Sequence, residues 1–107
     1  MGGDGQPQSQ AALFTRHVLY RQPLDRAIDA PRWLLGRTWG SAHTNLRLES
    51  RFSEGLIDRL LSAGHDVEVL PDAYSDTMGH AGAVVLQANG TLEGAHDPRA
   101  DGGAAGV

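Results

Sequence analysis

Two glycines stand directly before a predicted helix, where backbone groups could bind an anion. Gly2 and Gly3 precede Asp4-Gly5-Gln6, and Pro7 suits the first turn of a helix because its missing N–H costs nothing there. Glycine has no Cβ, so its backbone can approach a bound molecule closely. Free N–H groups at the start of a helix also attract anions. Two glycines alone are more typical of a flexible loop that opens a helix, because short glycine motifs are unreliable, and that interpretation stays open.

A second group of polar residues precedes the last predicted pair of strands. Ser75, Asp76 and His80 are residue types found in a nucleophilic triad. A triad is recognised by its geometry, however, and not by closeness in sequence. Polar side chains also crowd loops because water solvates them there. We therefore interpret this group as solvated loop.

The five histidines lack the spacing of a metal site. His17 stands alone in a predicted helix, and no pair shows a spacing such as H-x₃-H among His43, His65, His80 and His96. The chain has no cysteine, which excludes both disulfides and thiolate ligands. We expect solvated or hydrogen-bonded histidines, with no metal and no cofactor.

Two tryptophans and one charged motif complete the candidates. Trp33 follows Pro31-Arg32 in an apolar stretch, which predicts a core residue. Trp39 lies in a polar loop, and we place it at a subunit surface. Asp97-Pro98-Arg99 predicts a structural turn in which Arg99 bonds nearby carboxylates or carbonyls, rather than a clamp for a ligand.

Helices and strands that alternate along the chain must position these residues. Helical spacing predicts a helix with a broad apolar face over 7–21 and a shorter one that ends before Pro31. Ser53 is a suitable N-cap for a third helix, and Gly64 suits its C-terminal end. Strands are expected at 32–35, 46–49 and 67–69. A hairpin over 81–95 should follow, with a type I′ turn at Asn89-Gly90. The tail 101–107 is expected to be loose unless it is docked.

Composition narrows the class of protein. The chain has 107 residues and a net charge of -4, and its nine positive charges, all arginine, form no basic face that would bind nucleic acid. No apolar run approaches the ~20 residues needed to span a bilayer. Fourteen glycines and a hydrophobic share of 40% predict a thin core that depends on a partner. We treat residues 1–107 as a single unit.

The order of these motifs resembles the last third of the small subunit of γ-glutamyltransferases, over essentially the whole chain. The pieces that carry the resemblance are Gly2-Gly3, Ala30-Pro31-Arg32 before an aromatic residue, Ser62-Ala63-Gly64-His65 at a helix end, and Asp97-Pro98-Arg99 near a Gly/Ala-rich end. Each piece is weak alone, but their order and spacing together are specific. The resemblance implies an α+β fold that forms the C-terminal portion of an αββα N-terminal-nucleophile hydrolase sandwich, incomplete by itself.

The resemblance also implies an activity. In that family, a threonine at the N-terminus of the small subunit attacks a γ-glutamyl amide, and its own α-amine serves as the base. That threonine lies upstream of the segment matched here, so the expected partners are the large subunit, the N-terminal part of the small subunit, and a small γ-glutamyl or acyl amide. Only Gly2 and Gly3 carry over as catalytic positions, through backbone N–H groups of an oxyanion hole. A substrate-side role for Asp76 or Thr77 is a further hypothesis, since this stretch runs near the active site in the family.

One departure bears on specificity. Asp4-Gly5-Gln6-Pro7 follows the glycines, where the best-studied transferases have a shorter link that contains an arginine. It resembles a neighbouring branch with acylase-like members, so the choice between γ-glutamyl and other acyl groups, and between transfer and hydrolysis, stays open. Two alternatives from other classes also remain. The chain could be a non-catalytic module that binds a protein through exposed sheet edges, or a non-functional relic of a truncated gene in which Met1 is an internal methionine.

Overall fold

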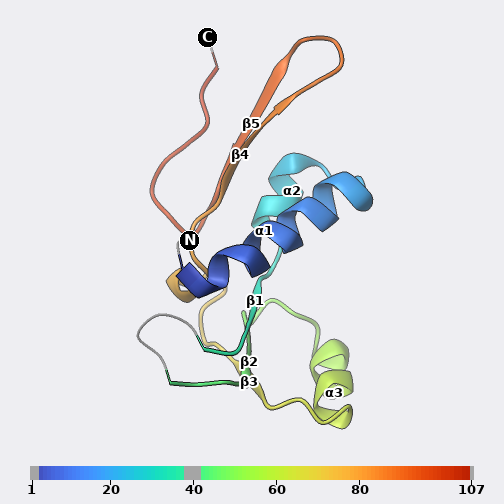
Figure 1. Ribbon diagram of the computed structural model, residues 1–107, viewed down its shortest axis with the longest axis vertical. Coiled ribbons are helices and arrows are strands. Elements are labelled where there is room, and N and C mark those ends of the chain that lie inside the picture. Colours follow the sequence, from blue (N-terminus) through green and yellow to red (C-terminus); the bar gives the residue numbers. More distant parts are fainter. Residues whose placement is uncertain (1–2, 38–41, 107) are drawn as a thin grey trace.

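The computed structural model describes residues 3–37 and 42–106 and shows a helical layer between two small sheets (Figure 1). A 3₁₀ turn, η1 (Gly3–Gly5), leads into α1 (Gln6–Phe14). One π-helical turn, η2 (Thr15–Leu19), continues α1, and α2 (Leu24–Asp29) folds back against it. None of the helices in the described ranges is long and apolar enough to cross a bilayer.

The first sheet contains three short strands in the order β1-β2-β3. β1 (Trp33–Leu35) pairs antiparallel with β2 (Leu46–Leu48), and β2 pairs parallel with β3 (Val67–Val69). The helix α3 (Glu54–Ser62) connects the two parallel strands, as such a connection requires. Gly64, with a φ of 88°, ends this helix, and the N–H of His65 donates to the carbonyl of Leu60 in a Schellman motif.

The second sheet is the predicted hairpin. β4 (Gly82–Leu86) pairs antiparallel with β5 (Leu92–His96), and a 3₁₀ turn, η3 (Asp76–Met78), precedes it. The expected type I′ turn is wrong, because Gly90 has a positive φ of 85° but Asn89 does not. The connection is therefore one residue longer, and Gly90 alone takes the left-handed position that completes a bulged hairpin.

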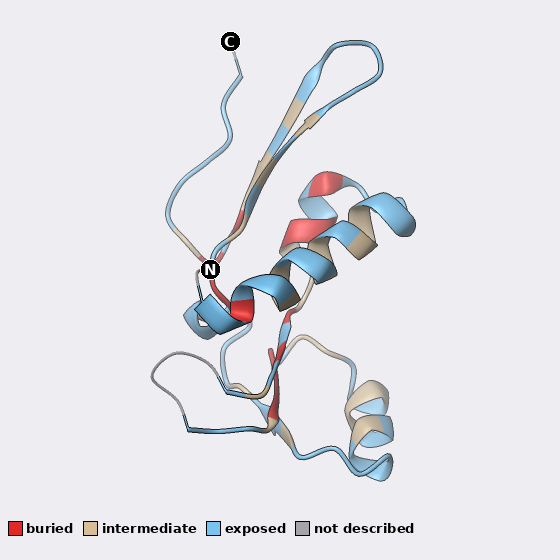
Figure 2. Ribbon diagram, viewed as in Figure 1, coloured by how far each residue is buried: buried red, intermediate tan, exposed pale blue. Residues whose placement is uncertain are grey.

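The core is small and lies where α2, β1 and β2 meet (Figure 2). Among the described residues, the buried hydrophobic side chains are Leu24, Ala27, Ile28, Leu34, Leu46, Leu48 and Met78. Six polar residues are buried with them, namely Arg32, Arg47, Glu49, Ser75, Asp97 and Arg99. A core with nearly as many polar as apolar side chains must be held together by directed polar contacts.

Two predictions about the apolar residues need correction. Trp33 was expected in the core but is 36% exposed, because the alternation of β1 turns Leu34 inward and Trp33 and Leu35 outward. The helix over 7–21 was expected to press its apolar face onto a sheet, yet no residue of α1 or η2 is buried. Ala12 and Leu13 are half-buried, but Phe14 and Leu19 are exposed, so this face is only partly covered within the described residues.

The hairpin also exposes an apolar face. Val84, Leu86 and Leu92 are 71%, 70% and 67% exposed, and the pairing of Leu86 with Leu92 places them together. The C-terminal tail runs past the same sheet, where a Cβ on Gly94 would lie 3.1 Å from the Cβ of Ala104. Exposed apolar surface of this kind favours association.

We expect the isolated 107-residue chain to self-associate through this hairpin face. Replacing Val84, Leu86 and Leu92 with threonine keeps β propensity but removes apolar surface, so the weight-average mass should shift toward the monomer in sedimentation velocity. Val85→Thr, on the half-buried side of the same strand, is the matched control and should destabilise the chain without reducing association. A wild-type chain that stays monomeric at high concentration would contradict this expectation.

Candidate functional site

The predicted glycine turn lies at the start of α1. Gly2 is outside the described residues, so its predicted role is untested. Gly3 opens η1, is exposed, and has a φ of 77°, a left-handed conformation that favours glycine. A Cβ placed on Gly3 would meet no described atom within 4 Å, so the strain of a substitution would come from φ rather than from crowding.

A loop formed by residues 75–81 lies beside the first turns of α1. The hydroxyl of Ser9 in α1 donates to the carbonyl of Met78 at 3.4 Å. A groove of about 510 Å³ separates the helix from the start of the hairpin, and both the first turns of α1 and the end of the loop line it, through Gln6, Ser9, Gln10, His80 and Ala81 among others. The first turns of α1, which follow the glycine turn, and the end of the 75–81 loop therefore border one groove.

The 75–81 loop carries an exposed acid–base pair. The Nε2 atom of His80 lies 3.2 Å from Oδ1 of Asp76, and both side chains are more than half exposed. Ser75, the third member of the imagined triad, is buried, and its backbone N–H donates to Glu49. The structure thus brings Asp76 and His80 together and gives Ser75 a structural position. A shallow cavity of about 390 Å³ joins this pair to the segment 98–101.

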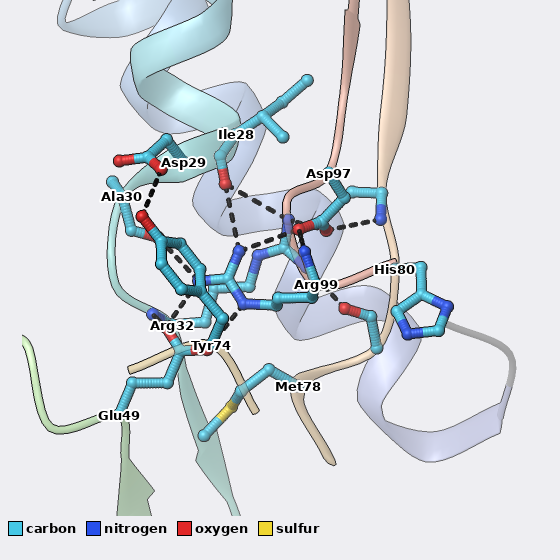
Figure 3. A network of polar contacts seen from close by, with 12 residues as sticks. Ile28, Asp29, Ala30, Arg32, Glu49, Tyr74, Met78, His80, Asp97 and Arg99 are labelled. Carbon is cyan, nitrogen blue, oxygen red and sulfur yellow. Dashed lines mark hydrogen bonds and ion pairs between the residues drawn. The ribbon is translucent and has the colours of Figure 1, made fainter. Parts of the chain in front are cut away.

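Four buried charged side chains lie beneath the loop, and we call them the charge cluster (Figure 3). Arg99 binds Glu49 through two hydrogen bonds, one of them 2.6 Å long from Nε, and also reaches Asp97 at 3.0 Å. Arg32 pairs with the other oxygen of Asp97 at 2.6 Å. The cluster contains two positive and two negative groups, so its formal charge is zero.

The charge cluster also binds the backbone of the segments around it. Glu49 accepts from the N–H groups of Arg32 and Ser75 at 2.8 and 3.0 Å. Asp97 accepts from the N–H of Ala81 at 2.7 Å. The arginines donate to carbonyls in return, namely those of Gly79, Ile28 and Ala30. Such a set of contacts satisfies buried backbone groups that would otherwise be costly.

A second, outer layer closes the cluster toward solvent. The guanidinium of Arg51 stacks 3.9 Å from the ring centroid of Tyr74 and bonds both the side chain and the carbonyl of Asp29. The hydroxyl of Tyr74 donates to the same carboxylate at 2.8 Å. This layer fixes Asp29 at the end of α2.

The cluster keeps its carboxyl groups ionised. Burial opposes ionisation of Glu49, but hydrogen bonds from Arg99, Arg32 and Ser75 outweigh it and lower the pKa of that carboxyl. Burial likewise opposes ionisation of Asp97, yet the N–H groups of Arg99 and Ala81 and the charge of Arg32 lower its pKa. The same carboxylates raise the pKa of Arg99 against the effect of burial.

The sequence predicted part of this arrangement. The structural turn at Asp97-Pro98-Arg99 is confirmed, with Arg99 bonded to carboxylates and carbonyls. Glu49 was missed, because it stands at the end of an alternating strand, where a charged residue is expected to be solvated. Trp39 lies outside the described residues.

The histidines contribute hydrogen bonds where the structure shows their partners. His17 bonds the carbonyl of Gln22 at 2.9 Å, and His80 pairs with Asp76, as expected of hydrogen-bonded histidines. Within the described ranges, no group of three histidine or acidic side chains is placed to hold a metal ion.

Removing one partner of the charge cluster should destabilise the chain severely. Arg99→Met leaves Glu49 and Asp97 buried without their main partner, which typically costs about 3–5 kcal/mol of unfolding free energy. Arg26→Met is the control, because the Arg26–Asp25 pair is exposed on the surface and such pairs contribute at most about 1 kcal/mol. Urea unfolding followed by circular dichroism measures both. Similar losses in the two variants would contradict a structural role for the cluster.

The charge cluster should also make the free energy of unfolding depend on pH in the acidic range. Glu49 and Asp97 have lowered pKa values in the folded chain, against about 4.3 and 3.9 when unfolded. The two carboxylates therefore stabilise the fold fully at pH values above their unfolded-state pKa. This stabilisation is lost as the pH falls through their lower folded-state pKa values. Unfolding free energy should be level from pH 7 to about 5 and should fall steeply below about pH 4. A flat profile down to pH 3 would count against this linkage.

The sequence is similar to known proteins along its whole length. The sequence profile of the family described as gamma-glutamyltranspeptidase matches residues 1–107. The chain is 62% identical over 106 residues to an oxamate amidohydrolase proenzyme of Klebsiella pneumoniae, and 46% identical over 106 residues to a glutathione hydrolase-like proenzyme of Bacillus subtilis. In each case 99% of this chain matches 20% of the relative, so the chain spans about a fifth of the length of these relatives.

Solved structures confirm the expected fold class, an α+β portion of an N-terminal-nucleophile hydrolase. A cephalosporin acylase from Bacillus halodurans has a TM-score of 0.79 and 26% identity, and the match covers 94% of this chain and 18% of that one. A gamma-glutamyltranspeptidase from Pseudomonas nitroreducens has a TM-score of 0.71 and 21% identity, covering 92% of this chain and 48% of that one. Because the family profile covers every residue, the chain belongs to the gamma-glutamyltranspeptidase family.

Proposed function

We propose that this chain is the C-terminal part of the small subunit of an amidohydrolase that cleaves small acyl amides of the oxamate type. The observation that carries the proposal is the 62% identity to an oxamate amidohydrolase proenzyme over nearly the whole chain. The lower identity of 46% to a glutathione hydrolase-like proenzyme makes a γ-glutamyl amide the second choice of substrate. The link Asp4-Gly5-Gln6-Pro7, which departs from the transferase pattern, supports hydrolysis rather than transfer.

The chemistry needs a nucleophile from outside this segment. In our proposal, an N-terminal threonine in the rest of the small subunit attacks the amide carbonyl, and its α-amine accepts the hydroxyl proton. The C–N bond then breaks, the amine leaves with that proton, and water releases the acyl group from the threonine. The large subunit and the N-terminal part of the small subunit are therefore the partners of this chain. No cofactor enters these steps.

The contribution of this chain to the chemistry is the glycine turn. We assign the backbone N–H groups of Gly2 and Gly3 to the oxyanion hole, where they would stabilise the negative oxygen of the tetrahedral intermediate. Each such donor typically contributes ~3 kcal/mol to the transition state. The exposure of Gly3 and the free space around its Cα support this assignment, because a substrate carbonyl could approach closely.

The proposal predicts that a chimaeric proenzyme is active. In this chimaera, residues 2–107 replace the matching fifth of the Klebsiella pneumoniae oxamate amidohydrolase proenzyme, which high identity should permit. We expect ammonia release from oxamate by the chimaera and none by the 107-residue chain alone, because donors without a nucleophile give little rate above water. Gly3→Pro removes one donor and should lower kcat by about 10²–10³.

Gly3→Ala is the control for that variant. It keeps the N–H but must adopt the φ of 77°, so any loss reports backbone strain rather than a missing donor. Gel analysis must show that both mature subunits still form, since a processing defect would mimic a catalytic one. A Gly3→Pro enzyme that matures and keeps its kcat would refute the oxyanion assignment. A mature but inactive chimaera would refute oxamate as the substrate class, and a γ-glutamyl anilide would then be tested.

A further inference from the structure

Four backbone groups of the 75–81 loop bond to the charge cluster or to α1. The N–H of Ser75 donates to Glu49 at the start of the loop, and the N–H of Ala81 donates to Asp97 at its end. Between them, the carbonyl of Gly79 accepts from Arg32 at 2.8 Å. The loop is thus held at both ends and near its middle by charged groups that are themselves fixed by one another.

The hydrogen bonds to the charge cluster maintain an unusual backbone conformation in the loop. Gly79 has φ 68° and ψ 176°, a region that is essentially open to glycine alone. The Met78 side chain beside it is 1% exposed and forms the underside of the loop. Asp76, Thr77 and His80, by contrast, are exposed on its upper side. The anchored backbone holds the exposed polar side chains of the loop in fixed positions. This arrangement is typical of functional loops on a rigid scaffold.

The loop in turn contacts the helix that begins with the glycine turn. Ser9 lies near the start of α1, shortly after Gly3, and its hydroxyl donates to the carbonyl of Met78. Gln8 joins the same helix to β1 through the backbone N–H and carbonyl of Leu35. The start of α1 is therefore oriented from two sides, by β1 and by the loop.

We propose that Arg32 and Asp97 are positioning residues for catalysis. They hold the 75–81 loop, and through Ser9 the loop sets the orientation of the first turn of α1 and hence of the Gly3 N–H. This inference rests on the proposed function, because it needs the glycine turn to be an oxyanion hole. An oxyanion donor must be aimed at the transition state, and a displacement of about 1 Å far from the chemistry can cost about 10²-fold in rate.

The test uses three variants of the chimaeric proenzyme. Asp97→Asn loosens the ion pair with Arg32 while keeping an acceptor for the N–H of Ala81, and we expect kcat to fall about 10–100-fold. Ser9→Ala removes only the contact between α1 and the loop, and we expect a loss of about threefold or more. KM should stay within about twofold in both, because an oxyanion donor acts in the transition state and not in substrate binding.

Tyr74→Phe is the matched control. It removes one hydrogen bond from the outer layer of the same cluster, on the side of Asp29, and should leave kcat unchanged. If Asp97→Asn fails to mature, Ser9→Ala decides, since alanine is the best helix former and this variant should fold. Mature variants with kcat within twofold of the chimaera, losses confined to KM, or an equal loss in Tyr74→Phe would each overturn the proposal.

Amide hydrogen exchange separates this inference from the function on which it rests. In the full chimaera, Ser9→Ala and Asp97→Asn should speed exchange in peptides that cover 3–9 and 76–81, and Tyr74→Phe should not. This readout holds even if the unsubstituted chimaera does not hydrolyse oxamate, an outcome that would count against the function alone. Unchanged exchange over 3–9 in Ser9→Ala would show that the loop does not position the helix.

Discussion

The buried pairing of two arginines with two carboxylates is the interaction on which the rest of this structure depends. Glu49 follows β2, Arg32 precedes β1, and Asp97 and Arg99 follow β5, so the charge cluster joins the two sheets, which share no strand. Its arginines also donate to the carbonyls of Ile28 and Ala30 at the end of α2. The end of α2, the first sheet, the hairpin and the 75–81 loop therefore meet at this cluster.

Apolar side chains could not replace this cluster without further cost. Strands and helices end around it, and their last N–H and C=O groups have no partners within the elements themselves. An apolar core of the same volume would bury those groups unsatisfied, at a cost for each one. Balanced charges supply both donors and acceptors in fixed directions, and Arg99 alone serves two carboxylates and two carbonyls. Burial of the ions is tolerated because each is paired and hydrogen-bonded.

Local patterns in the sequence were sufficient to predict most helices and strands, but not the charge cluster that joins them. The helices around 24–29 and 54–62, the three short strands and the hairpin follow from proline, glycine and apolar spacing, and the structure confirms them. The burial of Glu49 depends on residues 26 and 50 positions away, at Ser75 and Arg99, which no local period encodes. Trp33 was misplaced for a related reason, since alternation fixes which residues share a face but not which face is covered. The proposed oxyanion role of Gly3 came from the resemblance to a family and has no local pattern of its own.

The helix α1 stands between a rigid and an uncovered part of the molecule. Its first turns contact the loop that the charge cluster holds, while Phe14 and Leu19 at its other end are exposed. The relatives are about five times longer than this chain, so most of their sequence has no counterpart in it. In our proposal, the rest of the enzyme docks onto the apolar faces of α1 and the hairpin and fixes the far end of the helix, as the cluster fixes the near end. In our proposal, the glycine turn at the start of α1 is aimed at the substrate only in the assembled enzyme, and the apolar surface that this segment leaves exposed is an interface with the rest of it.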